Sequence, residues 1–167
     1  MKRSEKKMAL LFIDMDNFKN INDTLGHLIG DKFLIEVAKS IKEFIREQDT
    51  LARLGGDEFT ILIDDIDSAI DIVPVAEHII ETFNTPVSID DKKLYSGISM
   101  GISIFPDDAT TYEELIKAAD TAMYQVKETG KQSFKFYNKA MNTKITERVS
   151  IENDLRNAIT KDELFLV

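Results

Sequence analysis

Short apolar stretches of two kinds alternate along this chain, and each kind predicts a different element. Residues 8–13 form an unbroken apolar run, which is typical of a central strand buried on both faces. Within residues 51–63, two apolar runs flank Gly55 and Gly56 and predict a tight hairpin, because glycine tolerates the positive φ of such turns. Three later segments have the pattern of strands: residues 86–91 and 94–105, which are expected to pair, and residues 133–137.

Apolar residues that recur every three or four positions predict three helices, over residues 31–46, 69–83 and 112–128. Asp31 stands where the first helix would have its N-cap, and Pro74 must lie in the first turn of the second. The segment before Asp31 predicts a turn whose backbone N–H groups could face an anion. This order of elements predicts an α/β fold with a mixed, mostly antiparallel sheet flanked by helices.

Composition narrows the class of protein. The chain has 167 residues, 43% of them hydrophobic and 31% charged, which suits one compact domain. No apolar run is long enough to span a bilayer, so we expect no membrane contact by this segment. The absence of cysteine excludes disulfides and thiolate metal sites and fits the cytoplasm. A net charge of −9 argues against nucleic acid as a partner.

Acidic residues follow the first strand and occupy the hairpin tip. Asp14 and Asp16 come directly after the run of residues 8–13, while Asp57 and Glu58 follow the paired glycines. If these two elements are neighbours, Asp14 and Asp57 converge and offer oxygen ligands to a hard divalent cation. The alternative is that Asp14 and Asp16 begin a solvated turn or cap the next segment, as aspartate often does.

Four blocks of this sequence resemble the GGDEF family of diguanylate cyclases. They occur in the order expected of that family, at residues 14–31, 53–59, 98–102 and 119–130. Spaced blocks are far more specific than a lone short motif. The resemblance implies a palm-like nucleotide cyclase fold. It also implies the condensation of two GTP into cyclic di-GMP, with release of pyrophosphate, in bacterial second-messenger signalling.

The resemblance assigns the acids to metal binding and proton transfer. It implies Mg²⁺, or Mn²⁺, held by Asp14, the main-chain carbonyl of Met15, and Asp57. Such a metal would neutralise phosphate charge and lower the pKa of the attacking 3′-hydroxyl. Either Asp57 or Glu58 would help to remove the hydroxyl proton, and the sequence leaves that choice open.

The resemblance assigns further residues to GTP. Gly55 and Gly56 would let the nucleotide lie across the hairpin. The implied triphosphate contacts are Lys19, Lys127 and Lys131, the last of which replaces an arginine common in the family. The implied guanine contacts are Asn22 and Asp31, with Phe18 and Leu34 as apolar walls.

Guanine recognition by Asp31 has a chemical reason. An ionised carboxylate only accepts hydrogen bonds, which suits the N1–H and N2 donors of guanine and penalises adenine. His27 belongs to the same block, where contact with the ligand and packing at a helix start are both open.

Arg46 and Asp49 have the spacing of the family's RxxD site for product inhibition. An arginine can bind guanine as a fork, and an aspartate can take its donors. The alternative is an arginine at a helix end with a local ion pair to Asp49. His78 stands where a second arginine often assists, so cyclic di-GMP would bind more weakly or with a dependence on pH.

We expect a GGDEF domain over residues 1–138, followed over residues 139–167 by a connector helix and the truncated start of an EAL domain. The leading hypothesis is a diguanylate cyclase that works as a homodimer, because each subunit holds one GTP. One alternative is a catalytically silent GTP-binding domain that controls a C-terminal EAL phosphodiesterase. A third is a receptor that binds only cyclic di-GMP.

Overall fold

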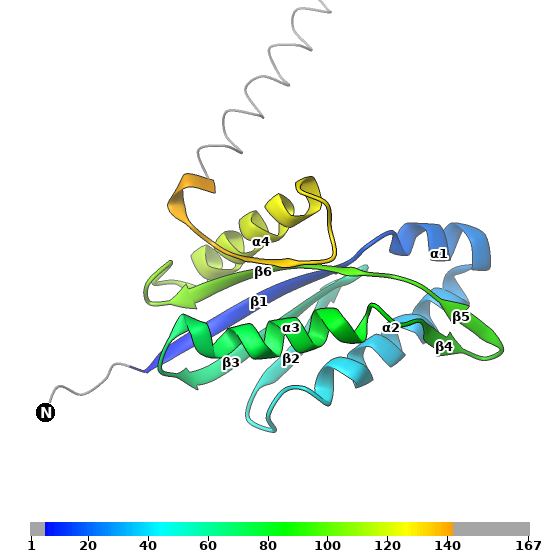
Figure 1. The fold of residues 1–167 in the computed structure, drawn as a ribbon, viewed down its shortest axis with the longest axis horizontal. Coiled ribbons are helices and arrows are strands. Elements are labelled where there is room, and N and C mark those ends of the chain that lie inside the picture. The colour runs from blue at the N-terminus through cyan, green and yellow to red at the C-terminus, as the bar shows by residue number, and fades with distance from the viewer. Residues whose placement is uncertain (1–5, 142–167) are drawn as a thin grey trace, which may run out of the picture.

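A computed structural model describes residues 6–141, which form a five-stranded sheet between two layers of helices (Figure 1). The strand order is β2-β3-β1-β6-β7, and every neighbouring pair is antiparallel except β6 and β7. The prediction of a mixed, mostly antiparallel sheet is therefore confirmed. The strands are β1 (Lys7–Met15), β2 (Thr50–Gly55), β3 (Glu58–Ile66), β6 (Ile98–Phe105) and β7 (Phe134–Phe136).

The helices that lie with this sheet in the described part of the chain are α1 (Phe18–Leu25), α2 (His27–Lys42), α3 (Val73–Thr82) and α4 (Tyr112–Glu128). A short 3₁₀ helix, η1 (Ala69–Ile72), leads into α3, and Pro74 lies in the first turn of α3 as expected. Helices α2 and α3 cover one face of the sheet and α4 covers the other (Figure 1).

The central strand β1 is buried on both faces. Leu11 and Ile13 pack into the core beneath α2 and α3, whereas Leu10 and Phe12 pack against α4. This alternation is the two-residue period of a strand. A Cβ atom at Gly101 on β6 would collide with the backbone of α4, so that glycine permits a close approach of helix and sheet.

The segment after β1 differs from the prediction. It forms α1 rather than a turn, and Gly26, with φ of +83°, separates α1 from α2. Helix α2 begins at His27, so Asp31 is not its N-cap, and it ends at Lys42 rather than at residue 46. An eight-residue helix with only Phe18 and Ile21 buried carries too little periodicity to be recognised.

The predicted pairing of residues 86–91 with 94–105 is wrong. Strand β4 (Val87–Ile89) pairs with β5 (Lys92–Leu94) in a separate two-stranded sheet. Strand β6 instead pairs with β1 and β7, because a strand that is buried along its length must satisfy its backbone inside the main sheet.

Part of the C-terminal prediction lies outside the described residues. Residues 142–167, which include most of the expected connector and EAL start, are not described, so that assignment stays a prediction. Over residues 6–141, none of the helices has the length and apolar character needed to cross a bilayer.

Candidate functional site

The end of β1 lies beside the tip of the β2–β3 hairpin. In the antiparallel register of β1 and β3, Asp14 is opposite Glu58, and the N–H of Met15 donates to the carbonyl of Asp57 at 3.3 Å. Two segments more than forty residues apart in the sequence therefore place their acids together, as the hypothesis of a shared cation site requires.

Asp14 is a buried carboxylate with a cationic partner. Its side chain projects on the α4 side of the sheet, and its Oδ2 lies 2.7 Å from Nζ of Lys127. Burial raises the pKa of Asp14, the Lys127 ammonium opposes that shift, and the charges of Asp57 and Asp16 add to it. Since Asp14 is 7% exposed and Asp16 only 2%, the alternative of a solvated turn is wrong.

Asp16 is held entirely by the protein. The hydroxyl of Ser99 donates to its Oδ1 at 2.8 Å, and the N–H of Gln132 donates to its Oδ2 at 3.2 Å. Its main chain is bonded as well, to the carbonyl of Gly97 and the hydroxyl of Ser96. The sequence analysis assigned Asp16 no such role, although an acid close to the end of a buried strand is a signal that it is hydrogen-bonded.

The donor set fits magnesium. No group of three or more His, Cys, Asp or Glu side chains within residues 6–141 is arranged to hold a metal ion. Mg²⁺, however, is usually held by one or two protein carboxylates together with substrate phosphates and water. Asp14, Asp57 and the carbonyl of Met15 offer hard oxygen donors of that kind, and two adjacent carboxylates favour a cation.

The hairpin tip faces open space. Gly56 has φ of +54° and begins a two-residue turn, which explains that glycine. Gly55 lacks a left-handed backbone, and a Cβ atom at either glycine would meet nothing within 4 Å. Neither backbone conformation nor packing within the described residues therefore requires glycine at position 55.

Arg53 supports the same turn. Its Nε and Nη2 both donate to the carbonyl of Gly56, at 2.9 and 2.7 Å. This pair of bonds ties β2 to the residue just before Asp57. The sequence analysis recognised Arg53 only as part of the motif, because no sequence pattern indicates that an arginine side chain will donate to a carbonyl three residues later.

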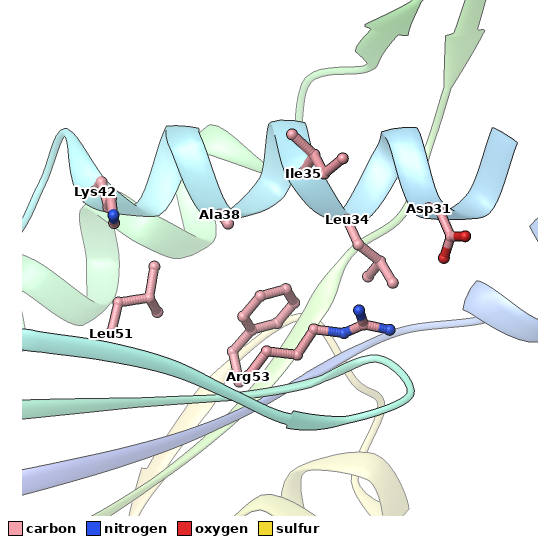
Figure 2. A pocket seen from close by; sticks show the side chains of 8 residues that line it. Asp31, Leu34, Ile35, Ala38, Lys42, Leu51 and Arg53 are labelled. Atoms are coloured by element: carbon pink, nitrogen blue, oxygen red, sulfur yellow. The ribbon is translucent and has the colours of Figure 1, made fainter. Parts of the chain in front are cut away.

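A cavity of about 540 Å³ lies between α2 and the β2–β3 hairpin (Figure 2). Asp31 and Leu34, two of the expected guanine contacts, line it from α2. Arg53 extends along the opposite wall, with its guanidinium toward the Leu34 and Asp31 end. The remaining lining residues are Ile35, Ala38, Lys42, Leu51 and Phe59.

The other two expected base contacts are more deeply placed. Phe18 is a core residue that stacks on Phe33 with ring centroids 6.1 Å apart, and it does not line this cavity. The Oδ1 atom of Asn22 is buried and has no hydrogen-bond partner among the described residues. A Cβ atom at Gly30 would collide with that oxygen, so Gly30 makes room for Asn22. An unpaired buried acceptor is unfavourable until a donor reaches it.

The expected cations divide into two groups. Lys127 is paired with Asp14, and Nζ of Lys131 lies 3.0 Å from Oδ1 of Asn17, just beyond β1, so both stand near the acids. Lys19 on α1 and His27 at the start of α2 are exposed and do not line the cavity of Figure 2.

The RxxD residues form a closed turn. Asp49 accepts a hydrogen bond from the main-chain N–H of Arg46 at 2.8 Å, and its own N–H donates to the Arg46 carbonyl. Both residues line two cavities of about 430 and 580 Å³. His78 lines neither cavity and stacks instead on Phe44, with centroids 4.8 Å apart.

Comparison with known proteins gives the class. Residues 1–133 match the family described as "Diguanylate cyclase, GGDEF domain". The chain belongs to this family.

Two proteins of Pseudomonas aeruginosa are among its relatives. The chain is 40% identical over 164 residues to the bifunctional diguanylate cyclase/cyclic di-GMP phosphodiesterase MucR, covering 98% of this chain and 24% of MucR. It is 40% identical over 129 residues to the diguanylate cyclase TpbB, covering 77% of this chain and 30% of TpbB. The chain thus spans less than a third of either protein.

Solved structures confirm the fold. The isolated GGDEF domain of TpbB (or YfiN) superposes with a TM-score of 0.81 at 36% identity, covering 84% of this chain and 83% of that one. An EAL/GGDEF domain protein from M. capsulatus superposes with a TM-score of 0.76 at 40% identity, covering 81% and 88%. Together the relatives and the fold link this chain to cyclic di-GMP signalling.

Proposed function

We propose that this domain condenses two GTP molecules into cyclic di-GMP and releases pyrophosphate. The observation that carries the proposal is the buried carboxylate of Asp14, placed beside the hairpin acids and next to the open Gly55–Gly56 tip. Burial of a charge at a strand end is unfavourable unless the charge is paired or binds a metal, so a carboxylate in this position is consistent with a metal–nucleotide site. The intact motif supports an active enzyme.

The acids would bind the metal and accept a proton, and the lysine would contact phosphate. Mg²⁺ held by Asp14, Asp57 and the Met15 carbonyl would neutralise phosphate charge and lower the pKa of the 3′-hydroxyl. Lys127 already neutralises Asp14 and, at the mouth of the site, is suited to meet a phosphate. Asp57 or Glu58 would accept the hydroxyl proton, since both carboxylates lie at the tip where the nucleotide would cross.

The guanine base would be recognised by hydrogen-bond acceptors of the protein. The unpaired Oδ1 of Asn22 and the carboxylate of Asp31 offer acceptors to the N1–H and N2 amino donors of guanine. Adenine has no such pair of donors, so ATP would leave these acceptors unpaired.

Catalysis would need two subunits. Each 3′-hydroxyl must attack the α-phosphate of a second GTP, and one domain offers one such site, so two domains must face each other. Product would act back through Arg46 and Asp49, whose turn borders open cavities. The GGDEF domain of DgcB from Caulobacter crescentus, 25% identical to this chain, was solved in complex with c-di-GMP, which supports binding of the product by a domain of this fold.

A second candidate function is a GTP-binding regulatory domain without cyclase activity. The relatives named as phosphodiesterases, MucR, NbdA and PdeR, match over 160–164 residues, whereas TpbB and diguanylate cyclase A match over 129–130. This longer match supports a tandem arrangement with a C-terminal EAL domain, in which the GGDEF domain could serve the phosphodiesterase.

One assay separates the two candidates. The chain, fused to a coiled-coil dimeriser, is incubated with GTP and Mg²⁺, and the nucleotides are resolved by chromatography and mass spectrometry. Cyclic di-GMP that is lost in Asp57→Ala supports the cyclase. Tight GTP binding without product supports the regulatory domain, and no GTP binding at all contradicts both.

Cyclic di-GMP binding is measured separately by calorimetry. We expect Arg46→Ala to abolish it, because the guanidinium would supply the fork that holds the guanine. Unchanged binding in that variant would remove Arg46 and Asp49 from the inhibitory site.

A further inference from the structure

We propose that Asp16 is a positioning residue whose buried carboxylate holds the loop of residues 130–132, so that Lys131 faces the triphosphate. The inference rests on the proposed function for what Lys131 contacts, and on the structure alone for how the loop is held. Asp16 is the second acid of an Asp-x-Asp sequence at a strand end, a pattern that suggests two metal ligands.

Both oxygens of Asp16 are already engaged by protein donors. Ser99, at the start of β6, donates to Oδ1, and the backbone N–H of Gln132 donates to Oδ2. The residue is 2% exposed. Among the described residues, Asp14 by contrast is contacted at Oδ2 by the ammonium at the end of the Lys127 side chain. The two acids are therefore unequal, and only Asp14 is arranged to exchange its partner for a ligand.

The loop that Asp16 holds has an unusual backbone. Gly130, Lys131 and Gln132 have φ of 126°, 63° and 48°, a left-handed run that L side chains rarely adopt. Such a run persists only where the surroundings restrain it. The restraints are the bond from Gln132 to Asp16 and a bond from the Lys131 N–H to the Val126 carbonyl at 3.1 Å.

The restrained loop directs Lys131 to the end of β1. Its Nζ reaches Oδ1 of Asn17, the residue immediately after Asp16, at 3.0 Å. Asn17 is itself left-handed, with φ of 62°. The Lys131 ammonium thus contacts Asn17, which follows the anchoring residue Asp16 by one position and Asp14 by three. Without the anchor, the loop would relax toward ordinary backbone angles and the ammonium would leave the site.

The test compares Asp16→Ala with the conservative Asp16→Asn, and uses Asp14→Asn as the matched acid. Three quantities are measured on the whole chain: amide hydrogen exchange at Gln132, Mg²⁺ affinity, and affinity for a non-hydrolysable GTP analogue. Exchange requires no activity, so the anchor can be tested even if the chain makes no cyclic di-GMP.

In Asp16→Ala we expect exchange at Gln132 to quicken at least about tenfold and analogue affinity to fall about tenfold, the loss of one charge-assisted hydrogen bond. The Lys131→Ala variant should lose the same affinity, and the double variant no more than either, because both changes remove one contact. If the chain is active, KM for GTP should rise while kcat changes little.

Asp16→Asn should rescue the loop. Its amide oxygen can still accept from Gln132, and its NH₂ can donate to the Ser99 hydroxyl, so Mg²⁺ affinity should stay within about twofold of the wild type. Asp14→Asn should lose Mg²⁺ affinity and keep Gln132 protected. If Asp16→Ala does not fold, Ser99→Ala replaces it, with a smaller increase in exchange. Loss of Mg²⁺ binding in Asp16→Asn, or unchanged Gln132 exchange in every variant, would overturn the proposal.

Discussion

The two ends of the candidate site satisfy their polar groups in different ways. At the end that carries the acids, Asp14 is paired with Lys127, and Asp16 receives hydrogen bonds from Ser99 and Gln132. At the end expected to hold the base, Oδ1 of Asn22 has no partner among the described residues, and the nearby cavity is open (Figure 2).

The difference follows from the cost of burial. An isolated buried charge is too unfavourable to persist, so carboxylates at the charged end need cations and donors within the fold itself. A neutral amide oxygen left unpaired costs only about 1–3 kcal/mol, which a stable domain can carry until a ligand arrives. The charged end is thus preorganised, whereas the acceptor proposed to bind the base is left unpaired.

Among the changes at the charged end, Asp14→Asn is expected to have the largest effect. We expect cyclic di-GMP formation to fall at least about 100-fold, because the metal would lose a charged ligand worth several kcal/mol. Product is measured by chromatography over a range of Mg²⁺ concentrations. Asp91→Asn, an exposed acid in the β4–β5 turn, is the control and should retain full activity. Activity above about a tenth of the wild type would show that Asp14 is not a metal ligand.

The corresponding change at the base end is Gly30→Ala. The added Cβ would displace Oδ1 of Asn22, so affinity for a GTP analogue should fall about 10–30-fold while Mg²⁺ affinity stays the same. Discrimination against ATP should fall with it. Asn22→Ala should give the same loss in calorimetry, and a full-affinity Gly30→Ala would remove Asn22 from base recognition.

Between the two ends, Gly55→Ala tests the open hairpin tip. The free energy of unfolding should change by less than about 0.5 kcal/mol, because the site is open and the backbone is not left-handed. Affinity for the GTP analogue should fall about tenfold as the methyl group enters the expected path of the nucleotide. Gly56→Ala is the contrasting variant and should lose about 1–2 kcal/mol of stability in urea, because its φ is +54°. Unaltered nucleotide affinity in Gly55→Ala would place the ligand elsewhere.

Arg53→Ala tests whether the hydrogen bonds from Arg53 to the hairpin turn help to position Asp57 at the charged end. Removal of the two donors to the Gly56 carbonyl should loosen the turn that carries Asp57 and reduce kcat about fivefold, since these bonds are solvent-exposed. Lys93→Ala, an exposed cation on β5, is the control for the loss of one positive charge. Equal kinetics in the two variants would mean that Arg53 acts only through its charge.

The smallest effect concerns Asp108, a half-buried acid away from both ends. Burial raises the pKa of Asp108, whose carboxylate accepts the N–H of Ile104 at 2.7 Å. Because the folded-state pKa exceeds the unfolded one, the folded protein gains a proton first as pH falls, and the ionised group is destabilising at neutral pH.

Asp108→Asn keeps the acceptor without the charge. Its melting temperature should therefore equal or exceed that of the wild type at pH 7.5, and this advantage should shrink toward pH 4. The two proteins are compared by thermal unfolding across that range. An advantage that grows as pH falls would contradict the sign of the shift.

The regular elements were largely predictable. Helix α4 was expected over residues 112–128 and occupies Tyr112–Glu128, because its apolar face repeats over several turns. The β2–β3 hairpin was expected from paired glycines between apolar runs. By contrast, the break between α1 and α2 at Gly26 and the partners of β6 were missed, because short helices and non-local strand pairing have weak sequence signals.

The sequence by itself determined which groups are available: acids after a buried strand, acids beside a glycine turn, and lysines in and after the last helix. Only the tertiary structure decided which acid is anchored at both oxygens. Asp16 is anchored by residues 83 and 116 positions away, while Asp14, two residues earlier, is paired with the end of the Lys127 side chain. Burial and hydrogen bonding depend on neighbours that folding brings from distant segments, so two aspartates that look equivalent in the sequence have different roles in the structure.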